Sequence, residues 1–214
     1  MKQPRIHPLL VDIIQSSLLA CDGLVFDRRE ACPVCGGELA GYDTKKRQFA
    51  VILKDNEPGP VHVLVKRFSC RQCRAVCYAD EPFYPDTRLG SPVVDLCRTL
   101  AGIMPFHRTT AFLAHMGIFV DRGTIRNYAL GTFPEIPTTD LFGIRFPLSV
   151  VSLSTLAAGE GGRIIGTEAL AACGFPSAFR APPGPGLFKK RNEGDKQKRK
   201  EERQPKYPED RRHE

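Results

Sequence analysis

The spacing of apolar residues switches from a helical period to a strand period and back again along the chain. Near the N-terminus apolar side chains recur every three to four residues, and Pro8 and Gly23 suit the start and the end of a helix. Within residues 32–80 they alternate with polar side chains, which predicts strands. The helical period then returns at Ser91, which suits a cap, with Pro92 in the first turn. The predicted elements are a helix at 7–19, a hairpin of strands at 49–53 and 61–68 around a turn at 56–60, and helices at 91–104, 109–116 and 121–130.

After Gly131 the pattern weakens, because proline and glycine interrupt it. Residues 146–156 fit either a strand or a short helix, and residues 167–173 fit another helix. The chain then becomes rich in proline, glycine and charge with almost nothing to bury, which predicts disorder. The pattern indicates an α+β fold: a small antiparallel ribbon, a three-helix unit and a disordered C-terminal tail. The expected divisions are 1–28 (N-terminal helix), 29–80 (ribbon), 88–133 (three-helix unit), 134–180 (a small region that the pattern leaves unassigned) and 181–214 (charged tail).

Composition narrows the class of protein. A length of 214 residues with 42% hydrophobic side chains suits one or two small domains. No run of about 18 apolar residues occurs and the N-terminus lacks the features of a secretory signal, so we expect no membrane association. Eight cysteines in such a chain indicate reduced thiols or metal ligands, and therefore a cytoplasmic protein. The net charge of +7 favours polyanionic partners, although residues 189–214, with 11 basic and 7 acidic side chains, supply +4 of it.

Two Cys-x-x-Cys pairs are the strongest chemical signal in the sequence. Each pair can turn so that both thiolates face one ion, and two pairs supply the four sulfur ligands that structural Zn²⁺ prefers. The 34 residues between the pairs leave room for the hairpin. Each pair would then form a tight metal-binding turn, or knuckle, of the rubredoxin-like kind. Iron is the alternative metal, because its tetrathiolate sites use the same spacing. Weaker alternatives are buried thiols without a metal, a redox dithiol, and Cys77 as a substitute ligand. The predicted ligands are Cys32, Cys35, Cys70 and Cys73.

The last helix of the three-helix unit has the composition of a DNA-recognition helix. Asp121 can cap it, and Ile125 and Ala129, one turn apart, face inward. The opposite face then carries arginine and asparagine, which read guanine and adenine edges in the major groove. The alternative is a helical bundle with ordinary polar side chains, and the turn at 117–120 is about two residues longer than in the tightest helix-turn-helix motifs. The predicted DNA contacts are Arg122, Gly123, Thr124, Arg126 and Asn127.

Several short stretches of the chain together carry a family resemblance. They are Cys-Pro-Val-Cys-Gly at 32–36, Arg-Phe-Ser-Cys-Arg-Gln-Cys at 67–73, Phe-Tyr-Pro at 83–85, Arg-Leu-Gly at 88–90, Gly117 and the run at 120–128. Their order resembles the N-terminal region of insertion-sequence transposases, in which a two-knuckle zinc ribbon precedes a helix-turn-helix. The resemblance covers residues 30–130 and implies zinc and DNA binding.

The catalytic domain of that family positions three acidic residues to hold metal ions. The acidic residues downstream of Gly131 include Asp140, Glu160 and Glu168, but the pattern there predicts no strand that carries an inward-facing aspartate. We therefore expect no enzymatic activity. The sequence predicts a zinc-dependent DNA-binding protein that is transposase-like without a recognisable catalytic domain, with double-stranded DNA as its partner.

Two other classes of protein stay open. One is a zinc-ribbon adaptor that binds another protein in transcription or related machinery, which the modest charge of residues 1–188 favours. The other is an iron redox protein. The apolar stripe of the first helix also permits a homodimer.

Overall fold

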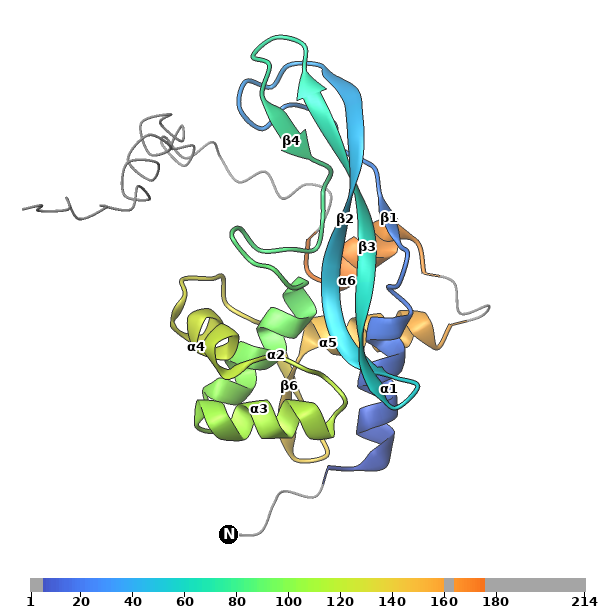
Figure 1. Ribbon diagram of the computed structural model, residues 1–214. Helices are drawn as coiled ribbons and strands as arrows, with labels where there is room; N and C mark the ends of the chain where they lie inside the picture. Colours follow the sequence, from blue (N-terminus) through green and yellow to red (C-terminus); the bar gives the residue numbers. More distant parts are fainter. Residues whose placement is uncertain (1–5, 160–163, 176–214) are drawn as a thin grey trace, which may run out of the picture. The chain divides into compact units, whose positions relative to one another are not determined.

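The structure is a computed structural model and describes residues 6–159 and 164–175 (Figure 1). The chain forms two units, residues 1–180 and 181–214. The second unit, which is the tail predicted to be disordered, lies outside the described residues. The described part of the first unit mixes helices and strands, in agreement with an α+β fold. None of its helices has the length and apolarity needed to span a membrane.

Most of the predicted elements are present in the described residues, with shifted ends. Helix α2 begins at Ser91 as predicted, but its N-cap is Gly90, so the assignment of Ser91 as the cap is wrong. Residues 146–156 contain both alternatives, the end of a strand followed by a helix. In chain order the elements are α1 (Pro8–Leu19), β1 (Val25–Phe26), β2 (Leu39–Lys54), β3 (Glu57–Cys70), β4 (Val76–Tyr78), α2 (Ser91–Ala101), α3 (Phe106–His115), α4 (Arg122–Leu130), β5 (Thr138–Leu141), β6 (Ile144–Pro147), α5 (Leu148–Ala157) and α6 (Gly166–Ala172).

Strands β2 and β3 form a hairpin that is longer than the sequence predicts. The turn predicted at residues 56–60 is wrong, because the chain reverses at Asp55 and Asn56, which have φ of +50° and +68°. Two successive residues with a left-handed backbone form the tight two-residue turn, and the twist of this turn matches the twist of the paired strands. Pro58 and Pro60 therefore lie inside β3. They occupy alternate positions beside the turn, so that their nitrogens, which carry no hydrogen, face away from β2.

The sheet that contains this hairpin has the order β1-β3-β2, and β4 also pairs with β3. Pairing is antiparallel between β3 and both β2 and β4, as expected for a ribbon. Strand β1, however, pairs with β3 in parallel, which the prediction of an antiparallel ribbon did not include. One half of β3 contributes the fully buried Val61, Val63 and Val65 to the core. The other half leads to β4 and the cysteine pairs, at the end of the hairpin opposite α1 (Figure 1).

The three helices α2–α4 are attached to the outer edge of β2 by backbone hydrogen bonds. The N–H of Gly90 donates to Phe49 (2.8 Å), that of Phe119 donates to Val51 (2.9 Å), and Leu53 donates to Gly117 (2.8 Å). The segment between α3 and α4 thus acts as a short extra strand, which explains why this turn is longer than in a tight helix-turn-helix. The edge strand is covered where it meets the helices, and the orientation of α4 is tied to the sheet.

One hydrophobic core runs through the described residues. It includes buried side chains of α1, the sheet, α2–α4, β6, α5 and α6. A polar contact crosses it: the buried carboxylate of Asp95 accepts hydrogen bonds from Tyr84 Oη (2.9 Å) and Ser149 Oγ (2.8 Å). This carboxylate therefore joins α2, the segment that precedes it and α5.

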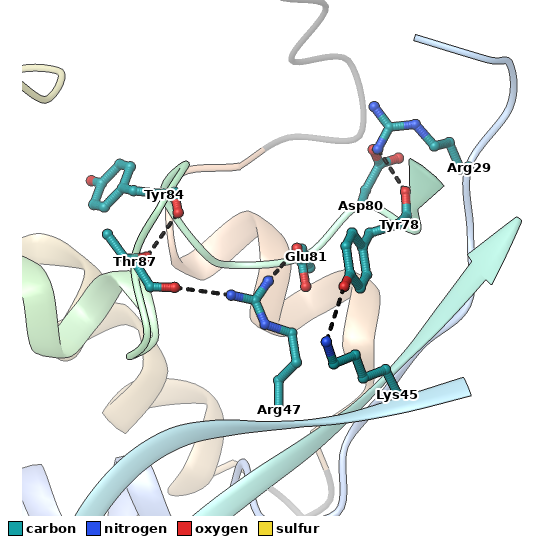
Figure 2. A network of polar contacts seen from close by, with 8 residues as sticks. All are labelled: Arg29, Lys45, Arg47, Tyr78, Asp80, Glu81, Tyr84 and Thr87. Carbon is teal, nitrogen blue, oxygen red and sulfur yellow. Dashed lines mark hydrogen bonds and ion pairs between the residues drawn. The ribbon is translucent and has the colours of Figure 1, made fainter. Parts of the chain in front are cut away.

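Arg47 of β2 fastens the segment between β4 and α2 to the sheet (Figure 2). Its guanidinium forms an ion pair with Glu81 and donates to the carbonyl of Thr87 (3.0 Å). It also lies 3.7 Å from the centre of the Phe83 ring, a cation–π arrangement. Burial raises the pKa of Glu81, and the charge of Arg47 opposes that shift. Arg47 thus links β2 to three residues of the chain that enters α2.

Candidate metal centre and helical surface

The four predicted metal ligands come together at one end of the ribbon. The sulfurs of Cys32, Cys35, Cys70 and Cys73 all lie within 4.8 Å of one another. Cys32 Sγ is 3.6 Å from Cys73 Sγ, and Cys35 Sγ is 3.4 Å from Cys70 Sγ. Four thiolates around Zn²⁺ at about 2.3 Å would be about 3.8 Å apart in a regular tetrahedron. The cluster therefore has the dimensions of a tetrahedral metal site.

The two Cys-x-x-Cys turns have the same backbone geometry. In the first, Cys32 N donates to Gly37 O (3.0 Å) and Gly36 N donates to Cys32 O (2.9 Å). In the second, the bonds at the same positions run from Cys70 N to Ala75 O (2.9 Å) and from Arg74 N to Cys70 O (3.1 Å). Each turn is thus closed by two equivalent hydrogen bonds. This repetition is what allows two short segments, far apart in sequence, to present their sulfurs to one point.

The residue after each pair has a left-handed backbone conformation. Gly36 has φ of +73° and Arg74 has φ of +62°. Glycine adopts this region freely, whereas a side chain there costs about 1 kcal/mol. The sequence indicates the special conformation in the first turn through its glycine and gives no such signal in the second.

Hydrogen bonds from the backbone favour the charged form of one cluster thiol. The N–H of Cys73 points to Cys70 Sγ (3.5 Å) and, with other hydrogen bonds, lowers the pKa of Cys70 to about 6. A backbone hydrogen bond from Ala75 favours the Cys73 thiolate, but partial loss of hydration at the sulfur and hydrogen bonds with the neighbouring thiols outweigh it and raise the pKa of Cys73 to about 12. Four adjacent thiolates repel one another, so full ionisation requires a cation between them.

The other cysteines stand outside this cluster. Cys77, the candidate substitute ligand, is buried on β4, and burial raises the pKa of its thiol. All eight cysteines are free thiols, and Cys21, Cys97 and Cys173 are buried elsewhere in the core. Within the cluster Cys32 and Cys70 are buried while Cys35 and Cys73 are exposed, so one side of the site faces solvent.

Helix α4 carries the residues predicted to contact DNA. Asp121 is its N-cap, and its carboxylate accepts from the backbone N–H of Thr124 (2.8 Å) and from its hydroxyl (2.5 Å). The pKa of Asp121 is lowered by these hydrogen bonds. The hydroxyl of Thr124 is thus occupied within the protein. Four of the five predicted contacts are exposed: Arg122, Gly123, Arg126 and Asn127.

The buried face of α4 differs in part from the prediction. Ile125 is fully buried as expected, but Ala129 is only half-buried, and Tyr128 is the second buried residue. The tyrosine ring packs edge-on against Phe133 (6.5 Å between centroids). The sequence pattern does not assign Tyr128 to the core, because the hydroxyl of a tyrosine allows it to lie either in the core or at the surface.

The N-terminal end of α4 borders an open hollow. Arg122 and residues 101–107 of the α2–α3 turn line a volume of about 470 Å³. Sites for small molecules are usually enclosed and bury most of their ligand. The hollow beside Arg122 is instead open to solvent.

Comparison of the chain with protein-family models, with curated proteins and with solved structures gives no match. The resemblance to the transposase N-terminal region therefore stays a prediction.

Proposed function

We propose that this protein is a zinc-dependent DNA-binding protein, in which the four-cysteine cluster holds a structural Zn²⁺ and α4 enters the major groove. The observation that carries the proposal is the exposed face of α4, where Arg122, Arg126 and Asn127 project from a helix with a capped N-terminus. Arginine and asparagine recognise base edges through paired hydrogen bonds, and a helix N-terminus favours a nearby phosphate.

The charge distribution of the helical unit supports a nucleic-acid partner. Residues 88–133 contain five arginines, no lysine and two acidic residues. Both acidic residues have internal roles, since Asp95 is buried and hydrogen-bonded and Asp121 caps α4. The outer surface of this unit is therefore basic, which favours association with phosphates.

The ligand chemistry supports a structural role for the metal. Four cysteines close a tetrahedral coordination sphere, which leaves no position for a substrate or water. Zinc is the metal that most often occupies such a site, and a colourless metal-loaded protein would exclude a ferric tetrathiolate centre. A cytoplasmic location suits the eight free cysteines, because that compartment keeps thiols reduced.

The order of ribbon, linking segment and three helices also supports a transposase-like DNA-binding region. Because the α3–α4 segment is hydrogen-bonded to β2, α4 and the ribbon would approach the duplex as one rigid unit.

A zinc-ribbon adaptor for another protein is the second candidate. Val34 in the first cysteine turn and Val76 after the second are each 47% exposed, and apolar side chains of this kind are suited to protein contacts.

The test is binding of the zinc-loaded full chain to a random duplex, measured by fluorescence anisotropy over a salt series. We expect micromolar affinity at low salt that falls steeply as salt rises. Replacing Arg122, Arg126 and Asn127 together by alanine should weaken binding about tenfold or more, whereas Arg145→Ala on β6 should change it little. Equal binding by the triple variant would contradict the role of α4. No binding at low salt would overturn the proposal in favour of the adaptor.

A further inference from the structure

Gly36 and Arg74 occupy equivalent positions in the two cysteine turns. Each follows the second cysteine of its pair, and each donates its N–H to the carbonyl of the first cysteine. Both have a left-handed backbone, with φ of +73° and +62°. The first turn therefore demonstrates that glycine fits this position, and the second turn holds an arginine where a glycine would be less strained.

The side chain of Arg74 gains no compensating contact within the described part of the chain. It is exposed, and no ion pair or side-chain hydrogen bond of the described residues involves it. Arg71, three residues earlier, is also exposed but forms an ion pair with Glu38 (3.2 Å). Arg74 is thus a positive charge held at the metal end of the ribbon at the expense of backbone strain. Backbone strain of this kind is concentrated at functional sites in proteins.

The distance between Arg74 and α4 follows from the strand register. Leu39 pairs with Cys70 next to the second cysteine turn, and Val51 accepts the hydrogen bond from Phe119, just before α4. Two bulges interrupt β2 between these residues, so their partners on β3, Cys70 and Pro60, are ten positions apart, which corresponds to about 33 Å of extended strand. Phe119 and Arg122 are three residues apart, so α4 starts within about 11 Å of the point where Phe119 meets the edge of β2. One turn of B-DNA measures about 34 Å.

We infer that Arg74 contacts a phosphate of the same duplex that α4 enters, about one helical turn away from the bases that α4 reads. The inference rests on the proposed DNA binding and extends it. It gives the DNA site a minimum length and gives the protein a second contact with the duplex. The metal would hold the turn that presents Arg74, and the hydrogen bonds between β2 and the α3–α4 segment would keep the two contacts at a fixed spacing. A contact to phosphate carries affinity and register without reading sequence.

The variant Arg74→Gly tests this inference because a structural and a functional role predict opposite results. Glycine relieves the left-handed strain, so metal content and thermal stability should stay the same or rise. Loss of one phosphate contact should weaken binding to a duplex of about three turns several-fold and lower the salt slope by about one. Arg71→Ala, in the same turn but ion-paired, is the matched control and should have a smaller effect.

Duplex length supplies the second measurement. A duplex of about one turn, 10–12 bp, cannot reach both contacts, so the wild-type chain should bind it less tightly than the longer duplex, and Arg74→Gly should make no difference on it. Equal affinity of wild type and Arg74→Gly for the long duplex would overturn the inference while leaving α4 as the DNA contact. If the wild-type chain binds neither duplex, the proposed function fails, and the inference fails with it.

Discussion

Gly90 lies directly against the ring of Phe49: a Cβ at Gly90 would come within 2.2 Å of Cε2 of that ring. The two residues are also joined by a hydrogen bond from Gly90 N to Phe49 O (2.8 Å). Phe49 is almost fully buried, so its ring has little room to move away. This contact brings the N-terminus of α2 against β2 and requires a residue without a side chain.

Replacing Gly90 by alanine should therefore destabilise the fold. We expect the free energy of unfolding to fall by about 1–3 kcal/mol, because the methyl group forces Phe49 or the start of α2 to shift. Urea-induced unfolding monitored by circular dichroism measures this change. Gly102→Ala is the control: this C-cap residue of α2 has φ of −69°, which alanine adopts, and the nearest atom to a new Cβ is 3.4 Å away. A stability equal to wild type in both variants would contradict the tight contact.

Arg47→Met should destabilise the junction between the ribbon and α2. The change removes the partner of the Glu81 carboxylate, whose Oε2 is already buried without a hydrogen bond among the described residues. The expected loss is about 2 kcal/mol or more, since an unpaired charge stays in a poorly hydrated place. Urea unfolding of this variant, of Glu81→Gln and of the double variant forms a cycle, in which the double variant should lose less than the sum of the single losses.

The Arg71–Glu38 pair is the matched control for that cycle. Both of its side chains are more than half exposed, so Arg71→Met should change the free energy of unfolding by no more than about 0.5 kcal/mol. An equally small effect of Arg47→Met would mean that the ion pair contributes no stability at the junction.

The features that the sequence predicts well are local ones. The helix cap at Asp121 and the two cysteine turns follow from residues within a few positions of one another, and the structure has both. The hairpin was also predictable, but its turn was misplaced by the Pro58-Gly59-Pro60 stretch. Prolines usually exclude a strand, and here they are tolerated because that side of β3 has no partner strand at this end.

The features that the sequence does not reveal depend on distant partners. Strand β1 is only two residues long and is stabilised by pairing with Leu64 and Val65 of β3. In the sequence the α3–α4 segment has only the features of an unusually long turn, because the hydrogen bonds that join it to β2 involve residues far away along the chain. The β5–β6 hairpin turns at Phe142, a bulky residue with φ of +52°, which stacks on the ring of His7 (4.7 Å between centroids). No local pattern predicts that contact.

Asp95 should make stability depend on pH. Burial raises the pKa of this carboxyl, and the hydrogen bonds from Ser149 and Tyr84 oppose the shift without cancelling it. The folded state therefore holds the proton more tightly than the unfolded chain, whose aspartates titrate near about 3.9. This contribution to stability is present below that pH and is lost as the pH rises through the higher pKa of the folded state.

The variant Asp95→Asn isolates this effect, because asparagine keeps the shape and can still bond both hydroxyl groups. Relative to the variant, wild type should lose stability as the pH rises above about 4, where the aspartates of the unfolded chain titrate. Thermal unfolding of both proteins at several pH values measures the difference. Parallel stability profiles would contradict a raised pKa, since the other titrating groups are the same in both proteins.

Removal of the metal should open only one end of the protein. Residues 33–36 and 71–74 of the cysteine turns are exposed, Cys35 and Cys73 among them. The other end of the hairpin packs Val61, Val63 and Val65 into the core that it shares with the helices. We therefore expect a bound metal to stabilise the turns and the adjacent half of the ribbon, and the shared core to stay folded without it.

Hydrogen exchange followed by mass spectrometry, with and without a chelator, tests this expectation. Protection should fall sharply in peptides that cover residues 32–38 and 70–78, and should persist in α2 and α5. Adding Zn²⁺ back should restore the lost protection, which separates metal loss from damage by the chelator. Unchanged exchange at residues 32–38 would show that the cluster holds no stabilising metal. Loss of protection throughout α2 and α5 would mean instead that the metal stabilises the whole fold, in the way that it does in a small zinc finger.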